Sequence, residues 1–361
     1  MSRLINFSAG PATLPLPALE HAQRELLDHE GTGISMLEHS HRGAAYQKVH
    51  DECKALLVEL LDVPDTHAVL FMQGGASAQF ALVPMNLLGP GQSADYVNTG
   101  TWSKKAIGEA KIVGQVRVAG TGEVNGAFTR IPSQSELKLD PNAAYVHITS
   151  NNTIMGTQYH AYPDTGAVPL VADMSSDILC RPVDVSKFGL IYAGAQKNLG
   201  PAGITVVIVR KDLAERSPDT IPSIFRYRTI LEGDSLQNTI PTFPVYMVRE
   251  VLRWVKAQGG APAMKRRNEE KAALLYDLID ADPDFFRCPV EKGSRSIMTP
   301  VVRLPSEALE KKAIAEALAA GFAGIKGHRS VGGLRISIYN AVEPSDVAKF
   351  VEFLKAFRAA N

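Results

Sequence analysis

Cysteine is scarce in this 361-residue sequence, and long apolar runs are missing. The three cysteines, Cys53, Cys180 and Cys288, are odd in number and widely spaced, with no CxxC pair, so they predict neither a disulfide framework nor a zinc site. A reducing compartment fits this usage best. No apolar run approaches the ~20 residues of a membrane-spanning helix, and the amino terminus has no apolar signal segment. We therefore expect a cytoplasmic protein without a metal site or a membrane segment.

The sequence also has no excess charge of either sign. Lys and Arg together number 38, as do Asp and Glu, so no net field would attract nucleic acid or an anionic membrane surface. Any anion must therefore bind at a local site. Apolar residues make up 45% and charged residues 21% of the chain, which is ordinary globular composition. The length exceeds what one hydrophobic core usually supports, which predicts two domains.

Short apolar runs alternate with helical patterns through the first 258 residues. Helices are expected at 18–29, where a GTG segment closes the helix, at 44–62, from about Ser77 and from about Thr101. Strands are expected at 68–72, 94–97, 145–149, 168–172, 189–194 and 204–209. Strands that are apolar on both faces and separated by helices predict an α/β domain with a mostly parallel sheet.

A second, smaller domain is expected after a break in a long helical stretch. The helical pattern at 245–279 contains the segment GGAP at 259–262, which is typical of a boundary. Two strands (299–304 and 334–339) and two helices (306–319 and 344–358) follow, which predicts a small α+β domain. The large domain is therefore assigned to 16–258, and the small one to 259–361 with the amino-terminal segment 1–15.

Lys197 follows a buried type of strand in the segment IYAGAQKNLGPAG (191–203). Small residues surround it, and Gly200 and Gly203 follow closely, which leaves room for a flat group beside the amine. A desolvated lysine has a lowered pKa and is a good nucleophile toward an aldehyde. Taken alone, the segment is more simply read as a turn with a surface lysine.

Asp173 ends the strand of VPLVADMSSD, about two dozen residues before Lys197. The carboxyl end of a parallel strand faces the crevice in which α/β proteins bind ligands. A carboxylate there can keep a pyridinium nitrogen protonated, as in enzymes that use pyridoxal 5'-phosphate (PLP). The alternative is a helix cap, a role for which Asp177, after Ser175 and Ser176, is the better candidate.

A glycine-rich turn, Gly74 to Ala76, joins a strand to a helix in FMQGGASAQF (71–80). The free backbone N–H groups at such a helix start favour phosphate, and glycine allows close approach. The turn matches neither GxxxxGK[ST] nor a complete GxGxxG, which argues against a nucleotide site. Many such turns bind nothing, so this signal is weak alone.

Two further residues lie near the same end of the predicted sheet. Trp102, at the start of a helix, could stack on a pyridine ring or simply belong to the core. Thr153, in SNNTIMGT, could reach the ring's phenolic oxygen or cap a loop. The order glycine turn, aromatic residue, strand-end Asp and then Lys, within one α/β domain, favours a PLP site.

Longer segments resemble one family closely. They are FSAGPATLP, EHSHRGAAY, QGGAS, NTGTWSKKA, ITSNNTIMGTQ, ADMSSDIL, YAGAQKNLGPAG, GDSLQNTIPTFPVY and GHRSVGGLRISIYNA. Over nearly its whole length the chain is similar to the phosphoserine aminotransferase family of class-V aminotransferases. The resemblance implies the PLP fold of the aspartate-aminotransferase type (fold type I) and a homodimer with active sites at the subunit boundary.

The resemblance also implies roles for individual residues. Lys197 would carry PLP as a Schiff base, Asp173 would pair with the pyridine nitrogen, and Trp102 would stack on the ring. The other implied cofactor contacts are Thr153 and Gln196 at the ring substituents, Gly75, Ala76 and Ser77 at the phosphate, and Asn238 and Thr239 at the phosphate of the neighbouring subunit's cofactor.

The implied substrate contacts are basic. Arg335 would bind the α-carboxylate, and two His-Arg pairs, His41 with Arg42 and His328 with Arg329, would receive the substrate phosphate or the distal carboxylate. Without this context such pairs are usually solvated surface, and Arg335 could be the polar face of an edge strand. One departure concerns Ser77, where some family members carry an arginine that helps to hold substrate phosphate.

The function that follows is amino transfer from L-glutamate to 3-phosphohydroxypyruvate, as in serine biosynthesis. A related four-carbon phosphorylated keto acid of pyridoxine biosynthesis is a possible second acceptor. A cysteine desulfurase or lyase of the same fold is the enzymatic alternative, and it would need a reactive cysteine on a mobile loop. The non-enzymatic alternative is a module that binds phosphate ligands without a cofactor.

Overall fold

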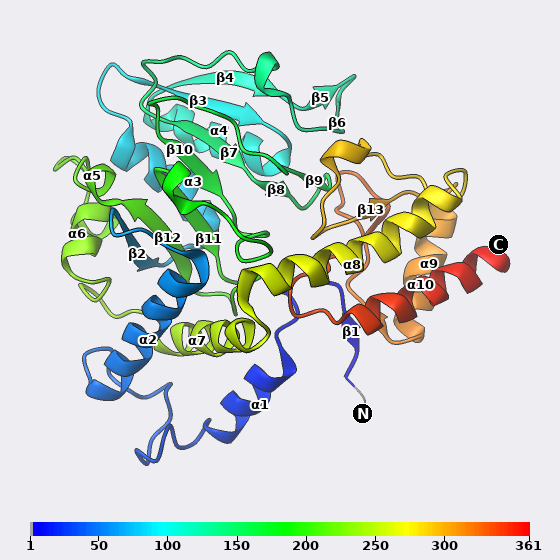
Figure 1. The fold of residues 1–361 in the computed structure, drawn as a ribbon, viewed down its shortest axis with the longest axis horizontal. Helices are drawn as coiled ribbons and strands as arrows, with labels where there is room; N and C mark the ends of the chain where they lie inside the picture. The colour runs from blue at the N-terminus through cyan, green and yellow to red at the C-terminus, as the bar shows by residue number, and fades with distance from the viewer. Residues whose placement is uncertain (1–2) are drawn as a thin grey trace.

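A seven-stranded sheet lies at the centre of the larger part of the molecule (Figure 1), in a computed structural model that describes residues 3–361. The strands, in spatial order, are β2 (His67–Met72), β12 (Thr205–Arg210), β11 (Leu190–Gly194), β10 (Leu170–Asp173), β7 (Val146–Thr149), β3 (Ser93–Asn98) and β4 (Gln115–Thr121). Neighbours pair in parallel, except that β12 runs antiparallel to β11 and β2. The predicted mostly parallel sheet is confirmed, and all six predicted strands belong to it.

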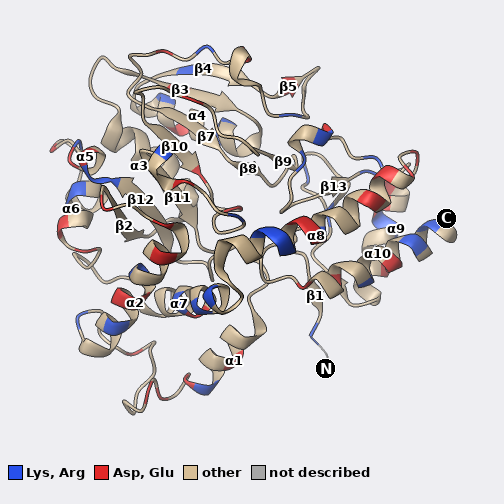
Figure 2. Cartoon of the chain, viewed as in Figure 1, with Lys and Arg blue, Asp and Glu red and all other residues tan. Residues whose placement is uncertain are grey.

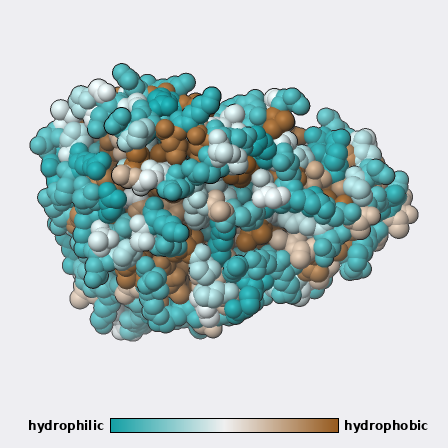
Figure 3. All heavy atoms as spheres, turned by 45° about the horizontal axis from the view of Figure 1, so that its top comes forward, coloured by the Kyte–Doolittle hydropathy of each residue, from teal (hydrophilic) through white to brown (hydrophobic). Residues whose placement is uncertain are grey.

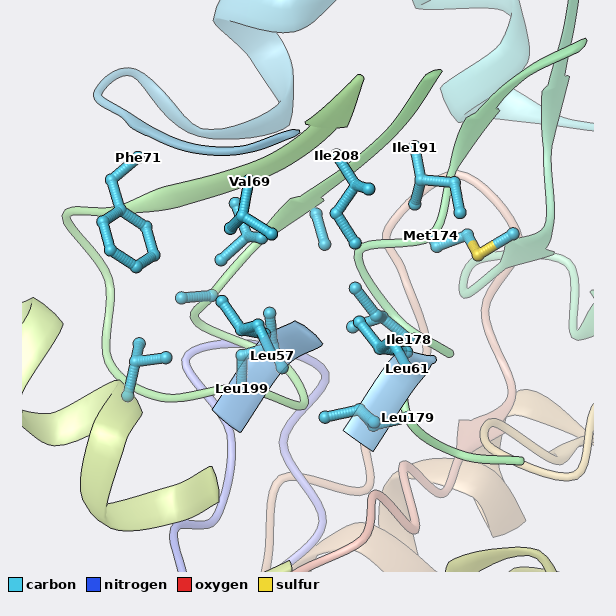
Figure 4. Close-up of a cluster of buried hydrophobic side chains, with 14 of the residues drawn as sticks. Leu57, Leu61, Val69, Phe71, Met174, Ile178, Leu179, Ile191, Leu199 and Ile208 are labelled. Carbon is cyan, nitrogen blue, oxygen red and sulfur yellow. The ribbon is translucent and has the colours of Figure 1, made fainter. Parts of the chain in front are cut away.

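Helices cover both faces of this sheet. The helices of this part are α1 (Leu16–Arg24), α2 (Ala44–Leu61), α3 (Gly75–Leu87), α4 (Thr101–Val113), α5 (Lys211–Ala214), α6 (Tyr227–Glu232) and α7 (Thr242–Ala257). Because side chains alternate along a strand, Val206 and Ile208 of β12 join the cluster of α2 and α7, whereas Val207 and Val209 join that of α3 and α4. Figure 4 shows the first cluster.

Shorter elements complete this part of the chain. They are the hairpin strands β5 (Glu123–Val124) and β6 (Ala127–Phe128), the pair β8 (Asn151–Asn152) and β9 (Thr157–Gln158), and single 3-10 turns at Gln134–Glu136, Val185–Lys187 and Ser223–Phe225. These elements are not predicted from the sequence, because each is too short to show a periodic pattern.

The predicted helix at 18–29 is wrong at its carboxyl end. Helix α1 ends at Arg24, and the following residues fold into turns. The Asp28 carboxylate accepts the Gly33 N–H at 2.7 Å, and the His29 N–H donates to the Ile34 carbonyl at 2.9 Å. These turn contacts take the place of helical hydrogen bonds. The apolar pattern in the sequence runs on past Arg24, and it therefore predicts a longer helix than the structure has.

The remaining elements form the smaller part of the molecule. They are α8 (Gly260–Ala281), α9 (Glu307–Ala319), α10 (Pro344–Ala359), a 3-10 turn at Lys292–Ser294, and the short strands β1 (Ile5–Asn6), β13 (Val301–Val302), β14 (Phe322–Ala323) and β15 (Leu334–Arg335). Strand β1 pairs in parallel with β14, and Phe7 joins the apolar cluster of α8 and α10. The amino-terminal segment thus packs with residues near the carboxyl end of the chain.

The predicted strands 299–304 and 334–339 are longer than the regular strands β13 and β15. Backbone bonds do continue past β15, because Ile336 and Ile338 donate to Pro300 and Met298, both at 2.9 Å. Ser337 between them donates instead to the Phe7 carbonyl at 3.2 Å. Residues 336–338 therefore bond alternately to the segment before β13 and to the amino-terminal segment. This alternation interrupts the regular pairing of β15 with β13.

The charged residues on α8 and α10 do not separate by sign. Figure 2 shows acidic and basic residues interspersed along α8 and α10. Figure 3 shows a mostly hydrophilic face with scattered apolar patches. None of the described helices combines the length and the apolar character needed to cross a bilayer.

A buried lysine joins α8 to the segment after β15. Lys271 has no exposed surface, and its Nζ donates to the carbonyls of Ile338 (2.9 Å) and Tyr339 (2.7 Å). Burial lowers its pKa from 10.5 to about 7, and Arg267 nearby adds to this effect. The neutral amine still has two N–H donors for these two carbonyls, so the contact survives deprotonation.

We expect Lys271→Met to lower the melting temperature of the protein more at pH 9 than at pH 6. The substitution leaves two buried carbonyls unpaired, which costs about 2 kcal/mol. Between pH 7 and 10.5 the unfolded chain holds a proton that the folded chain has released, so wild-type stability rises with pH across this window. Lys265→Met, at an exposed site on the same helix, is the control. An equal or larger shift at pH 6 would contradict the buried neutral amine.

Candidate active site around Lys197

Two neighbouring strands deliver the predicted catalytic pair to one edge of the sheet. Strand β10 ends at Asp173, and the parallel strand β11 ends at Gly194, three residues before Lys197. The carboxyl ends of adjacent parallel strands meet at the same edge, where α/β proteins bind their ligands. Figure 1 shows β10 and β11 side by side, so the two side chains converge because of the strand order.

Lys197 is half-buried, and its Nζ lies 5.2 Å from the centroid of the Trp102 ring. Burial lowers the pKa of the amine, while the nearby Asp173 carboxylate opposes this shift. The stem packs against Gly10, where an added Cβ would lie 3.3 Å from Lys197 Cγ. A lysine held in this way has the lowered pKa of a nucleophile or base, which rules out the simple surface-turn interpretation.

Asp173 is 6% exposed and bonded on one oxygen. Its Oδ1 accepts from the Ser175 backbone N–H (3.0 Å) and the Ser175 hydroxyl (2.6 Å), and within residues 3–361 no protein donor bonds Oδ2. Burial raises the pKa of this carboxyl, and Lys197 partly offsets the effect. The free oxygen fits a cationic N–H donor such as a pyridinium, which would restore the carboxylate form.

The helix-cap alternative for Asp173 and Asp177 is wrong in its simple form. Turns follow β10, and no helix begins there. Asp177 instead accepts hydrogen bonds from the Ser150 hydroxyl and from Gln158 (3.1 Å) and is buried among them. Asp173 does accept hydrogen bonds from Ser175 in the turn that follows β10, but only through Oδ1.

Trp102 is held in a fixed orientation. Its Nε1 donates to the Thr153 hydroxyl at 3.0 Å, and Thr153 is itself buried. The residues next to Trp102 and Thr153 in the sequence are also hydrogen-bonded and buried. The Ser103 hydroxyl donates to Thr149 (3.0 Å), and the Asn152 amide donates to Thr99 (2.7 Å). An aromatic ring fixed from behind provides a platform for stacking.

The glycine-rich turn opens α3 two residues earlier than predicted. Gly74 and Gly75 have φ values of +90° and +64°, which glycine adopts readily, and α3 begins at Gly75 rather than near Ser77. Ala78 is the first residue whose N–H bonds back into the turn, to Gly74 (3.2 Å). The N–H groups of Gly75, Ala76 and Ser77 are therefore available to an anion.

Asn238 and Thr239 lie beside this turn in the same chain. Asn238 Nδ2 donates to Gln73 Oε1 at 3.3 Å, and Gln73 Nε2 donates to the Thr239 carbonyl at 3.4 Å. Gln196 contributes its carbonyl, which accepts the Ala12 N–H at 2.9 Å. The last contact ties the segment of Lys197 to the amino-terminal residues.

Arg335 and His328 line a cavity of about 480 Å³ next to this site. Arg335 Nε is buried without a hydrogen-bond partner, which suits the binding of a carboxylate. His328 Nδ1 contacts the Ser330 hydroxyl at 2.8 Å, and Arg329 is exposed. Arg335 belongs to β15, but its unpaired guanidinium nitrogen distinguishes it from an ordinary edge-strand residue.

His41 and Arg42 lie elsewhere in the chain. They precede α2, and neither lines the cavity of Arg335. Arg42 is exposed, and His41 Nε2 is buried without a partner. Ser77 is exposed at the start of α3. His41 and Arg42 therefore lie apart from the cavity that Arg335 and His328 line.

Sequence reasoning missed three residues that support the site. The Ser175 hydroxyl donates to Asp173 and accepts the Gly194 N–H at 3.1 Å. Gly10 contacts the Lys197 stem, and the Asn198 side-chain oxygen accepts the Asn340 N–H at 3.0 Å. Only Ser175 had a local signal, because a hydroxyl two residues after an Asp often bonds its carboxylate. The other two contacts join distant segments.

Comparisons with known proteins agree with this arrangement. The family model of class-V aminotransferases matches residues 4–350. The phosphoserine aminotransferase of Niallia circulans is 52% identical over 359 residues, with 99% of both chains covered.

Two solved structures extend the comparison. The phosphoserine aminotransferase from Bacillus circulans subsp. alkalophilus has a TM-score of 0.97 at 52% identity, with 99% of both chains covered. The PLP-bound phosphoserine aminotransferase from Trichomonas vaginalis has a TM-score of 0.93 at 37% identity, over 98% of this chain and 100% of that one. The predicted aspartate-aminotransferase-like fold is confirmed. The chain belongs to the class-V aminotransferase family.

Proposed function

We propose that this chain is a PLP-dependent phosphoserine aminotransferase, which transfers the amino group of L-glutamate to 3-phosphohydroxypyruvate and forms O-phospho-L-serine and 2-oxoglutarate. The observation that carries the proposal is the Lys197 amine against the Trp102 ring, with the buried Asp173 carboxylate close by. The full-length similarity to phosphoserine aminotransferases supports the choice of substrates.

The residues present fit PLP at both ends. Asp173 Oδ2 has no protein donor within the described residues, and the first N–H groups of α3 remain available at the other end. A Cβ added at Gly75 would meet no atom within 4 Å, so the turn leaves open space for a phosphate. Lys197 would hold the cofactor aldehyde, Trp102 would stack on its ring, and Thr153 and Gln196 would lie at its edge. PLP supplies an electron sink for charge that develops at the substrate Cα.

The chain's own residues perform the remaining tasks. Lys197, once its amine is free and uncharged because of its lowered pKa, can take the Cα proton of the substrate and return it as a general acid. Arg335 orients the α-carboxylate through its planar guanidinium. Asp173 would accept the N–H of a pyridinium, and Trp102, whose Nε1 donates to Thr153, would hold the ring plane. 2-Oxoglutarate leaves the site before 3-phosphohydroxypyruvate binds in its place, so ping-pong kinetics are expected.

A shared active site in a homodimer is part of the proposal. His41 and Arg42 do not line the cavity of Arg335 in their own chain, so they would serve the site of the partner subunit. Asn238 and Thr239 would reach the cofactor phosphate across the same boundary. We also propose a cytoplasmic location, small-molecule substrates only, and the two-domain division at Gly259.

The desulfurase alternative loses support from the cysteines. Cys180 has no exposed surface, and burial raises its pKa well above the usual range. Burial also raises the pKa of Cys288, which is only partly exposed. Neither thiol has the thiolate character that sulfur transfer requires.

A coupled assay tests the proposed function. The purified protein is given L-glutamate with 3-phosphohydroxypyruvate or with the four-carbon phosphorylated keto acid, while its absorbance spectrum is recorded. We expect a coloured protein with turnover on 3-phosphohydroxypyruvate. A colourless protein without turnover would overturn the proposal and favour the phosphate-binding module, and sulfide release from cysteine would favour the desulfurase.

A further inference from the structure

Four basic side chains gather at the substrate end of the site without acidic partners. They are Lys105, His328, Arg329 and Arg335, and none forms an ion pair with a carboxylate among residues 3–361, although such pairs are common elsewhere in the chain. Burial lowers the pKa of the His328 imidazole, and the nearby charges of Arg335, Arg329 and Lys105 lower it further. Of the four, His328 and Arg335 line the 480 Å³ cavity. Uncompensated positive charge beside a cavity favours an anionic ligand.

Lys105 is the member of this group that the family resemblance does not assign. It lies in the first part of α4, and its Nζ is 4.7 Å from the centroid of the same Trp102 ring that Lys197 approaches. A cation near the amino end of a helix is electrostatically unfavourable, and no acidic residue occupies the first turn of α4 to offset it. An exposed lysine usually has no role beyond solvation, but the ammonium group of this one lies over the aromatic ring that Lys197 also approaches.

The neighbouring Lys104 provides the contrast. Its Nζ pairs with Glu123 at 3.7 Å and lies 4.6 Å from the centroid of the Phe128 ring. Its positive charge is therefore already matched by an acid, although its stem also lines the 480 Å³ cavity. The two consecutive lysines have similar exposure but different electrostatic surroundings.

We propose that Lys105 is a further substrate-binding residue, whose ammonium group binds the phosphate of the phosphorylated substrate beside Trp102 and His328. The inference rests on the proposed function and adds a cation from the same chain to the anion site. It also addresses the absence of an arginine at Ser77, because Lys105 supplies positive charge to the same substrate group.

Phosphate should depend on Lys105 more than carboxylate does. A phosphate monoester carries close to two negative charges at neutral pH, whereas the distal carboxylate of glutamate carries one. Lysine acts on such groups as a point charge, so its contribution grows with the charge of the ligand. Removal of the ammonium should therefore discriminate between the two amino donors.

The test compares Lys105→Met with Lys111→Met in the holoenzyme, with O-phospho-L-serine and L-glutamate as the varied amino donors. We expect K105M to raise KM for O-phospho-L-serine about tenfold, KM for glutamate less than about threefold, and to leave kcat within about twofold. K111M, at an exposed lysine in the last turn of the same helix, should leave both KM values nearly unchanged. K105R, which keeps the charge, should restore most of the affinity, and the cofactor spectrum should be the same in all variants.

Several outcomes would overturn the inference. An unchanged KM for O-phospho-L-serine in K105M, an equal rise for both donors, or an equal effect of K111M would each contradict a phosphate contact. A loss of cofactor absorbance in K105M would assign Lys105 to support of Trp102 instead. If the wild-type enzyme does not use O-phospho-L-serine, the proposed function is wrong. If the wild-type enzyme uses it and K105M has the same KM as wild type, only the role of Lys105 is wrong.

Discussion

Lys197→Ala is expected to abolish turnover, with a loss of at least about 10⁴-fold, and to remove the visible absorbance of the bound cofactor. The reason is that one amine is assigned two tasks, the covalent attachment of PLP and the movement of the Cα proton. Its position against Trp102 and its lowered pKa suit both tasks. Steady-state kinetics and an absorbance spectrum of the purified variant measure the two losses separately.

A control and a rescue sharpen this experiment. Lys187→Ala, at an exposed lysine that pairs with Asp184, should behave like wild type. A small primary amine in the buffer should restore part of the activity of K197A, because a free base can enter the space of the lost side chain. Normal turnover with retained absorbance in K197A would refute the assignment of Lys197.

Asp173→Asn should lower kcat/KM by about 10³-fold while the protein folds normally. The amide keeps the shape of the side chain, and its oxygen can still accept both contacts from Ser175. The negative charge is lost, however, and with it the interaction that would keep the pyridine nitrogen protonated. Kinetics with glutamate, together with circular dichroism as a check of folding, measure the effect.

Ser175→Ala is the matched variant for Asp173. It removes one of the two contacts to Oδ1 but leaves the charge, so a loss of about tenfold is expected. If D173N is as active as wild type, or if S175A is equally impaired, then the charge of Asp173 does not act on the cofactor.

The central sheet could be predicted from the sequence because its strands carry strong local signals. Strands β10 and β11 are buried on both faces and appear as apolar runs, and the strand-end positions of Asp173 and Lys197 follow from those runs. The convergence of the two residues could then be expected from the topology of parallel strands. The fold class needed little more than this pattern.

Other features depend on contacts between distant segments. Gly10 against Lys197, the Lys271 contacts with residues 338 and 339, and the shared segment after β15 leave no local trace in the sequence. The premature end of α1 has a local cause instead, since turn contacts of Asp28 and His29 with residues five positions later compete with a favourable helical pattern.

The substrate residues were assigned by family resemblance rather than by physical signal. Arg335 and His328 do lie together at one cavity, which supports their proposed roles. His41 and Arg42 lie outside that cavity, so their roles depend on the proposed dimer. Lys105 was not singled out, because its relation to Trp102 and His328 becomes visible only when α4 is placed beside the small domain.

Chemical mapping of the cofactor tests the central claim most directly. The holoenzyme is reduced with borohydride, which fixes PLP to the lysine that carries it, and the digested protein is analysed by mass spectrometry. We expect a single pyridoxyl-phosphate adduct on the peptide that contains Lys197. An adduct on another lysine, or no adduct in a protein saturated with PLP, would contradict the account.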